Sequence, residues 1–185
     1  MTRRRATLLL ALCFTASLVH AQAPPSAGGP FSLIAGDGRT ITDKSFPGRW
    51  LVVYFGYTFC PDVCPTTLGA IAEALEKLGP RAAKIQPLFI TVDPRRDTPE
   101  VIQKYVAAFD LRLIGLTGSP ASIAAAARAY HVFYEREESD GAYLIDHSTW
   151  IYVMNPAGEL AQVLPGASSG AAIAAAIATL MGAGN

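Results

Sequence analysis

Two cysteines lie close together in the segment GYTFCPDVCP, which covers residues 56–65, and each is followed by a proline. Because a residue before proline is disfavoured in the α region, we expect Cys60 and Cys64 to be non-helical. Pro65 suits the first residue of a helix, which makes Cys64 the expected N-cap. The positive end of a helix favours a thiolate, and thiolates are both metal ligands and nucleophiles. The spacing therefore predicts metal binding or thiol–disulfide chemistry. A structural disulfide is the plainer alternative, although so short a loop would restrict the unfolded chain little.

The histidine that would complete such a site is His147, in the segment YLIDHSTW (residues 143–150), just before a predicted strand. Two thiolates and one imidazole suit Cu(I), which accepts soft ligands, and Cu(II) would also accept the imidazole. A structural zinc ion would need a fourth ligand, and the separation of His131 from His147 is far from zinc-finger spacing. We therefore interpret His131 as a structural or surface residue. A lone histidine at the start of a strand is also commonly a surface or hydrogen-bonded residue, which is the alternative for His147.

The chain around these residues alternates between strands and helices. Continuous apolar runs predict buried strands, and apolar residues three and four apart predict helices. The predicted strands cover residues 50–56, 85–92, 113–116, 149–154 and 159–163, and the predicted helices cover residues 66–78, 99–109, 119–130 and 168–181. Such alternation implies a largely parallel sheet, to which the final hairpin adds antiparallel strands. This order, with two cysteines between the first buried strand and its helix, predicts an α/β thioredoxin-like fold. Its central mixed sheet is flanked by helices and preceded by an N-terminal extension.

The composition excludes several functional classes. The 185 residues carry 15 basic and 15 acidic side chains, so the formal net charge is zero and no basic excess exists to bind nucleic acid. Hydrophobic residues make up 51% of the chain, which is enough to build a core. Only three cysteines are present, which excludes a disulfide-dense mini-fold and a multi-zinc array.

Residues 1–21 have the plan of a secretory signal peptide. Three arginines at positions 3–5 precede an uncharged, mostly apolar run over residues 6–19, which is shorter than the roughly 20 residues of a spanning helix. An uncleaved anchor is the alternative. Residues 22–30, rich in proline, glycine and alanine, are expected to form a flexible linker before a single domain over residues 31–182. Cleavage would leave 12 basic and 15 acidic residues, a net charge of −3, and two cysteines in an oxidising, extracytoplasmic compartment such as the periplasm.

Three blocks of the sequence resemble the Sco/SenC family of copper-binding, thioredoxin-like proteins. These blocks are YFGYTFCPDVCP (residues 54–65), TVDPRRDTP (residues 91–99) and DHS (residues 146–148). The resemblance implies that Cys60, Cys64 and His147 bind one copper ion, as Cu(I) or Cu(II). It also implies a metallochaperone that supplies copper to the copper A centre of cytochrome c oxidase or prepares the cysteines of that centre. The partner would be the subunit that bears this centre or another copper chaperone. Many relatives keep a membrane anchor, so the N-terminus would serve as a tether to the inner membrane if it is not cleaved.

The main alternative is an extracytoplasmic thiol–disulfide oxidoreductase, in which Cys60 and Cys64 form a catalytic redox pair and His147 matters little. A peroxidase is a third reading, but nothing in the sequence singles out a thiol that forms a sulfenic acid. Whether the protein is an enzyme stays open, with a metallochaperone favoured. Asp93 follows a predicted strand at the end where α/β sites gather, so it is a candidate for orienting a ligand or partner. Asp97 or Thr98 is expected to cap the following helix.

Overall fold

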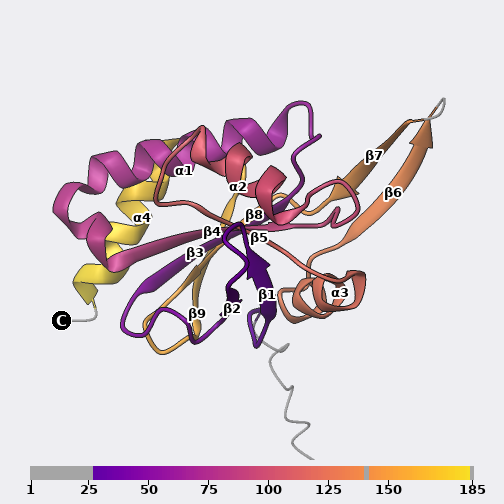
Figure 1. Cartoon of the computed structure of the whole chain (residues 1–185). Coiled ribbons are helices and arrows are strands. Elements are labelled where there is room, and N and C mark those ends of the chain that lie inside the picture. The colour runs from indigo at the N-terminus through magenta and orange to yellow at the C-terminus, as the bar shows by residue number, and fades with distance from the viewer. Residues whose placement is uncertain (1–26, 140–141, 184–185) are drawn as a thin grey trace, which may run out of the picture.

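The computed structural model describes residues 27–139 and 142–183 of the chain (Figure 1). The predicted signal peptide and most of the predicted linker therefore lie outside the described residues. The strands are β1 (Ser32–Ala35), β2 (Thr40–Thr42), β3 (Trp50–Gly56), β4 (Ile85–Thr91), β5 (Ile114–Thr117), β6 (Tyr134–Ser139), β7 (Ala142–His147), β8 (Trp150–Met154) and β9 (Leu160–Pro165). The helices are α1 (Val63–Leu78), α2 (Pro99–Ala107), α3 (Pro120–Ala129) and α4 (Gly170–Ala183), and a 3₁₀ helix, η1 (Gly79–Lys84), follows α1.

The main sheet has seven strands in the order β2-β1-β5-β4-β3-β8-β9. Strands β3, β4 and β5 are parallel to one another. On one side β8 pairs antiparallel with β3 and β9 antiparallel with β8, and on the other side β1 pairs antiparallel with β5 and β2 antiparallel with β1. Every residue of β4 is buried, and so is every residue of β3 after its first. Such continuous apolar strands form the centre of a sheet that is covered on both faces. The mixed α/β sheet confirms the predicted fold class.

Helices cover both faces of this sheet. Helices α1 and α4 pack side by side on one face, with α2 on the same side, and α3 lies on the other (Figure 1). Helix α2 begins after Thr98, whose hydroxyl accepts a hydrogen bond from the Val101 backbone N–H, and α3 begins after Ser119, which accepts in the same way from Ser122. A hydroxyl of this kind satisfies one of the free N–H groups at a helix start. The Thr98 cap confirms one of the two residues predicted for that position.

Two hairpins are additional to the predicted elements. Strands β1 and β2 extend the edge of the main sheet, and β6 and β7 form a separate two-stranded sheet that projects from the body of the molecule (Figure 1). Within the described residues, no helix is long and apolar enough to cross a membrane.

The expected start of α1 was wrong. Helix α1 begins at Val63, so Cys64 is its second residue rather than its N-cap, and Asp62 takes the N-cap position. Proline costs little in the first turn of a helix because the N–H that it lacks has no partner there. That tolerance outweighs the steric preference of the residue before proline. Cys60 lies outside the helix, as predicted.

Candidate metal centre

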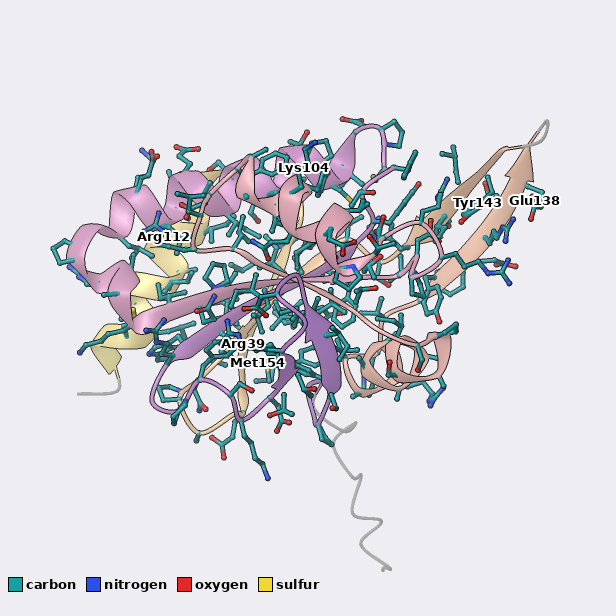
Figure 2. The ribbon with its side chains drawn as sticks, viewed as in Figure 1. Arg39, Lys104, Arg112, Glu138, Tyr143 and Met154 are labelled. Carbon is teal, nitrogen blue, oxygen red and sulfur yellow. The ribbon has the colours of Figure 1, made fainter. Side chains whose placement is uncertain are left out.

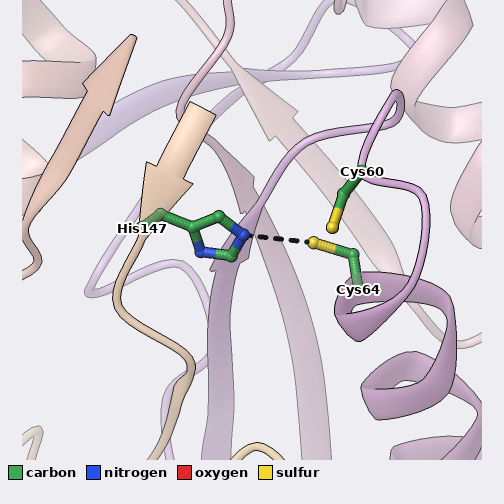
Figure 3. Close-up of side chains that lie close together, drawn as sticks. All are labelled: Cys60, Cys64 and His147. Atoms are coloured by element: carbon green, nitrogen blue, oxygen red, sulfur yellow. Dashed lines mark hydrogen bonds between the residues drawn. The ribbon is translucent and has the colours of Figure 1, made fainter. Parts of the chain in front are cut away.

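The carboxyl ends of β3 and β4 meet at one edge of the sheet, where Gly56 pairs with Thr91. The loop after β3 carries Cys60, the first turn of α1 carries Cys64, and His147 ends β7 just before β8. The two sulfur atoms and one imidazole nitrogen lie within 4.8 Å of one another (Figure 3). The three residues that the sequence singled out are therefore brought together, although 83 positions separate Cys64 from His147.

Cys64 is the innermost member of the centre. Its side chain is fully buried, and its Sγ lies 3.4 Å from His147 Nε2 and 3.8 Å from the Tyr54 hydroxyl, which donates to it. The end of β3 leaves room for this sulfur because its last residue, residue 56, is a glycine. A Cβ atom at Gly56 would lie 2.6 Å from Cys64 Sγ and 2.8 Å from Phe89 Cε2.

His147 presents one nitrogen to the cysteines. Its Nδ1 lies 3.0 Å from the carbonyl oxygen of Ser148, and because a carbonyl only accepts, Nδ1 carries the proton of the neutral ring. Nε2 therefore keeps its lone pair and faces Cys64. The ring contacts Tyr57 and Tyr54 in edge-on geometry, with centroids 5.8 and 6.5 Å away. A carbonyl partner on the second nitrogen is the usual way in which a ligating histidine is oriented.

The pKa values of the two thiols are shifted in opposite directions. Interaction with the Cys64 thiol lowers the pKa of Cys60, and the backbone N–H groups of Cys64 and Asp62 lower it further. The same pairing with Cys60, together with burial, raises the pKa of Cys64. Cys60 is thus the thiolate of the pair, held by the free N–H groups at the start of α1. The two cysteines are not joined by a disulfide in the structure.

A carboxylate predicted from the sequence as a possible helix cap instead holds the cysteine loop. Asp97 is fully buried and accepts hydrogen bonds from the Thr58 backbone N–H (3.1 Å), the Thr58 hydroxyl (2.6 Å) and the Thr91 hydroxyl (2.6 Å). Asp97 therefore fastens the start of the loop that leads to Cys60 onto the end of β4. Burial raises the pKa of Asp97 despite these hydrogen bonds.

The remaining candidates from the sequence lie outside the ligand cluster. His131 is exposed with a positive φ of 54°, which agrees with its interpretation as a structural or surface residue. Asp93 is buried, but it contacts Arg96 and the Tyr143 hydroxyl rather than the cysteines.

The centre opens to solvent on one side. A cavity of about 340 Å³ has Cys60 and His147 in its wall. Carboxylates and exposed apolar side chains surround it, and the lining includes Asp62, Glu137, Asp146 and Leu144. An incoming ligand would meet Cys60 and His147 before it met the fully buried Cys64.

The fold and the centre define a class: a thioredoxin-like protein whose cysteine pair, at the start of the helix after the first central strand, is joined by a histidine from a distant strand. Comparison with known proteins then identifies the family to which the chain belongs. The SCO1/SenC family model matches residues 19–182, and the chain belongs to this family.

Individual relatives agree with this placement. The chain is 40% identical to human "Protein SCO1 homolog, mitochondrial" over 161 residues, which is 85% of this chain and 54% of that protein. It is 45% identical to "Protein SenC" of Rhodobacter capsulatus over 130 residues, which is 70% of this chain and 59% of that protein. The chain thus matches between half and two thirds of the length of these relatives. Among solved structures, that of Arabidopsis thaliana ScoI with copper bound superposes with a TM-score of 0.81 at 39% identity, covering 85% of this chain and 99% of that one.

Proposed function

We propose that this protein is a copper metallochaperone that binds one copper ion through Cys60, Cys64 and His147. The observation that carries the proposal is the convergence of two sulfur atoms and one imidazole nitrogen within 4.8 Å, with Nε2 left as an acceptor by the Nδ1 contact to Ser148. Two sulfurs and one nitrogen form a soft donor set that suits Cu(I) and is also compatible with Cu(II). A relative at 39% identity has been solved with copper bound, which supports the choice of metal.

Release of the metal would begin on the open side of the centre. Cys60 and His147 line the cavity, whereas Cys64 is fully buried, so an acceptor ligand would replace Cys60 or His147 first and Cys64 last. The proposed acceptor is the subunit of cytochrome c oxidase that carries the copper A centre, or another copper chaperone. The resemblance to the Sco/SenC family supports this choice of acceptor, together with an extracytoplasmic location. Residues 1–21 would serve there as a cleaved leader or as a tether to the inner membrane.

An anaerobic Cu(I) titration of the reduced protein against a competing chelator tests the proposal. We expect one tight site per chain, weakened by His147→Asn and abolished by the double change Cys60→Ser/Cys64→Ser. The matched control is His131→Asn, because His131 is exposed and asparagine tolerates its positive φ. Weak binding that is indifferent to His147 would exclude the proposed ligand set.

The asymmetry of the two thiols favours a second candidate function, reduction of a partner disulfide. The Cys60 thiolate would attack one sulfur of the partner and release the other as a thiolate, which takes up a proton. Cys64 would then lose its proton and displace the partner from Cys60, leaving an oxidised Cys60–Cys64 pair and a reduced partner. This function needs both cysteines and little from His147. Trapping of a mixed disulfide on Cys60 in the Cys64→Ser variant would support it.

A further inference from the structure

The strand that carries His147 is not part of the main sheet. It belongs to the β6–β7 hairpin, which forms a separate two-stranded sheet and projects from the body of the molecule (Figure 1). The position of His147 relative to the cysteines therefore depends on the contacts that fasten the hairpin. One of these is the Ile145 backbone N–H, which donates to the Tyr57 hydroxyl at 3.2 Å. Two more are made at Tyr143, which contacts a buried aspartate and an arginine.

Arg96, in the segment between β4 and α2, touches three parts of the structure at once. Its guanidinium pairs with the Asp93 carboxylate and donates through Nη1 to the Tyr143 carbonyl oxygen on the hairpin at 3.1 Å. It also lies 3.7 Å from the centroid of the Tyr143 ring and 4.6 Å from that of Phe59, the residue before Cys60. Tyr143 lies on the projecting hairpin (Figure 2). The arginine thus joins the hairpin that carries His147 to the loop that carries Cys60.

Asp93 and Tyr143, the two hydrogen-bond partners of Arg96, are also fixed in place. Asp93 is 3% exposed, and its two carboxylate oxygens accept from the Tyr143 hydroxyl at 2.9 and 3.1 Å. Tyr143 is therefore held at both ends, by its backbone carbonyl and by its hydroxyl. A planar guanidinium can stack on a ring and donate in two directions, whereas an ammonium group cannot do both.

We propose that Arg96 is a positioning residue for the metal centre. By holding the hairpin against the cysteine loop, it keeps His147 Nε2 directed at the sulfur atoms, and its hydrogen bonds and ring contacts are to residues other than the three proposed ligands. The proposal rests on the proposed function, because it assumes that His147 contributes to copper binding.

A double-mutant cycle on Cu(I) affinity tests this role. The affinity of the full chain is measured for wild type, Arg96→Gln, His147→Asn and the double variant. Partners that orient a metal ligand typically contribute 10- to 100-fold to metal affinity. We expect Arg96→Gln to lower the affinity by about 10-fold or more when His147 is present, and by less than about 2-fold when residue 147 is asparagine. An equal loss in both backgrounds, or no loss in either, would overturn the proposal.

Two further variants serve as controls. Arg95→Gln removes the same charge from the neighbouring, exposed position and should leave the affinity within about 2-fold of wild type. Arg96→Lys keeps the charge beside Asp93 and so protects the fold if Arg96→Gln does not express. We expect it to show a similar loss of affinity that depends on His147. Full wild-type affinity in Arg96→Lys would show that the charge alone suffices and would contradict the positioning by a stacked guanidinium that is proposed.

The metal-free protein gives an independent readout. Hydrogen exchange at the Ile145 amide, which bonds to Tyr57, should be faster in Arg96→Gln than in Arg95→Gln, because the hairpin is released. Unchanged exchange at this amide would contradict the proposal. If wild-type affinity itself does not depend on His147, the proposed copper site fails. If that dependence is present but Arg96 has no effect, only the positioning role fails.

Discussion

Gly56 provides the sharpest test of how the buried sulfur is accommodated. An alanine Cβ at this position would lie 2.6 Å from Cys64 Sγ and 2.8 Å from Phe89 Cε2, whereas non-bonded heavy atoms normally rest about 3.5–4 Å apart. Both neighbours are fully buried, so neither can turn out to solvent. The deficit of about 1 Å on each contact places Gly56→Ala among overpacking substitutions, which cost about 1–3 kcal/mol.

Gly56→Ala should therefore lower the free energy of unfolding of the reduced, metal-free protein by about 1–3 kcal/mol. It should also weaken Cu(I) binding, because the Cys64 sulfur has to leave the position in which it faces His147 Nε2. Urea denaturation followed by circular dichroism measures the first effect, and chelator competition measures the second. Gly69→Ala is the matched control: Gly69 is exposed within α1 and a Cβ there meets nothing within 4 Å, so alanine should stabilise by about 0.5–1 kcal/mol. A Gly56→Ala protein as stable as wild type, with unchanged copper affinity, would refute this packing argument.

The remaining predictions concern the two thiols and the buried carboxylate. With its pKa lowered, Cys60 should still react readily with iodoacetamide at pH 6, where an ordinary cysteine is only about 0.3% thiolate, whereas Cys64 should not react. Mass spectrometry of quenched samples distinguishes the two cysteines. Equal labelling of both would contradict the assigned difference between their pKa values. Because burial raises the pKa of Asp97, the folded state binds a proton more tightly than the unfolded state does, so stability from this group falls as pH rises from about 4 through its folded-state pKa. The free energy of unfolding of wild type relative to Asp97→Asn should accordingly increase when the pH is lowered from 7 to 4.5, and urea titrations showing the opposite slope would exclude a raised pKa.

Much of the main sheet was predictable because its central strands are continuous apolar runs. The sequence predicted residues 50–56 as a strand, and β3 has the same bounds. The β6–β7 hairpin was missed because β6 is largely exposed and polar and has no apolar run. Its one clear signal was the dipeptide Asp140–Gly141, which is a strong short-range indicator of a hairpin in sequence.

The candidate ligands were predictable from residue type, but the residues that support them were not. Cys60, Cys64 and His147 stand out because few other side chains suit a soft metal ion. Asp97 has the sequence context of a helix cap, and only the fold shows that its carboxylate faces Thr58 and Thr91 instead. Arg96 likewise looks like a surface residue until the hairpin is packed against it. Such roles arise from contacts between distant segments, which local sequence patterns do not encode.

X-ray absorption at the copper K-edge of the Cu(I)-loaded protein tests the proposed ligand set most directly. The proposed centre predicts two sulfur atoms and one nitrogen around a single copper ion in wild type. It also predicts the loss of the nitrogen, with both sulfurs retained, in His147→Asn. An all-sulfur environment in wild type, or identical spectra for the two proteins, would contradict a copper site built from Cys60, Cys64 and His147.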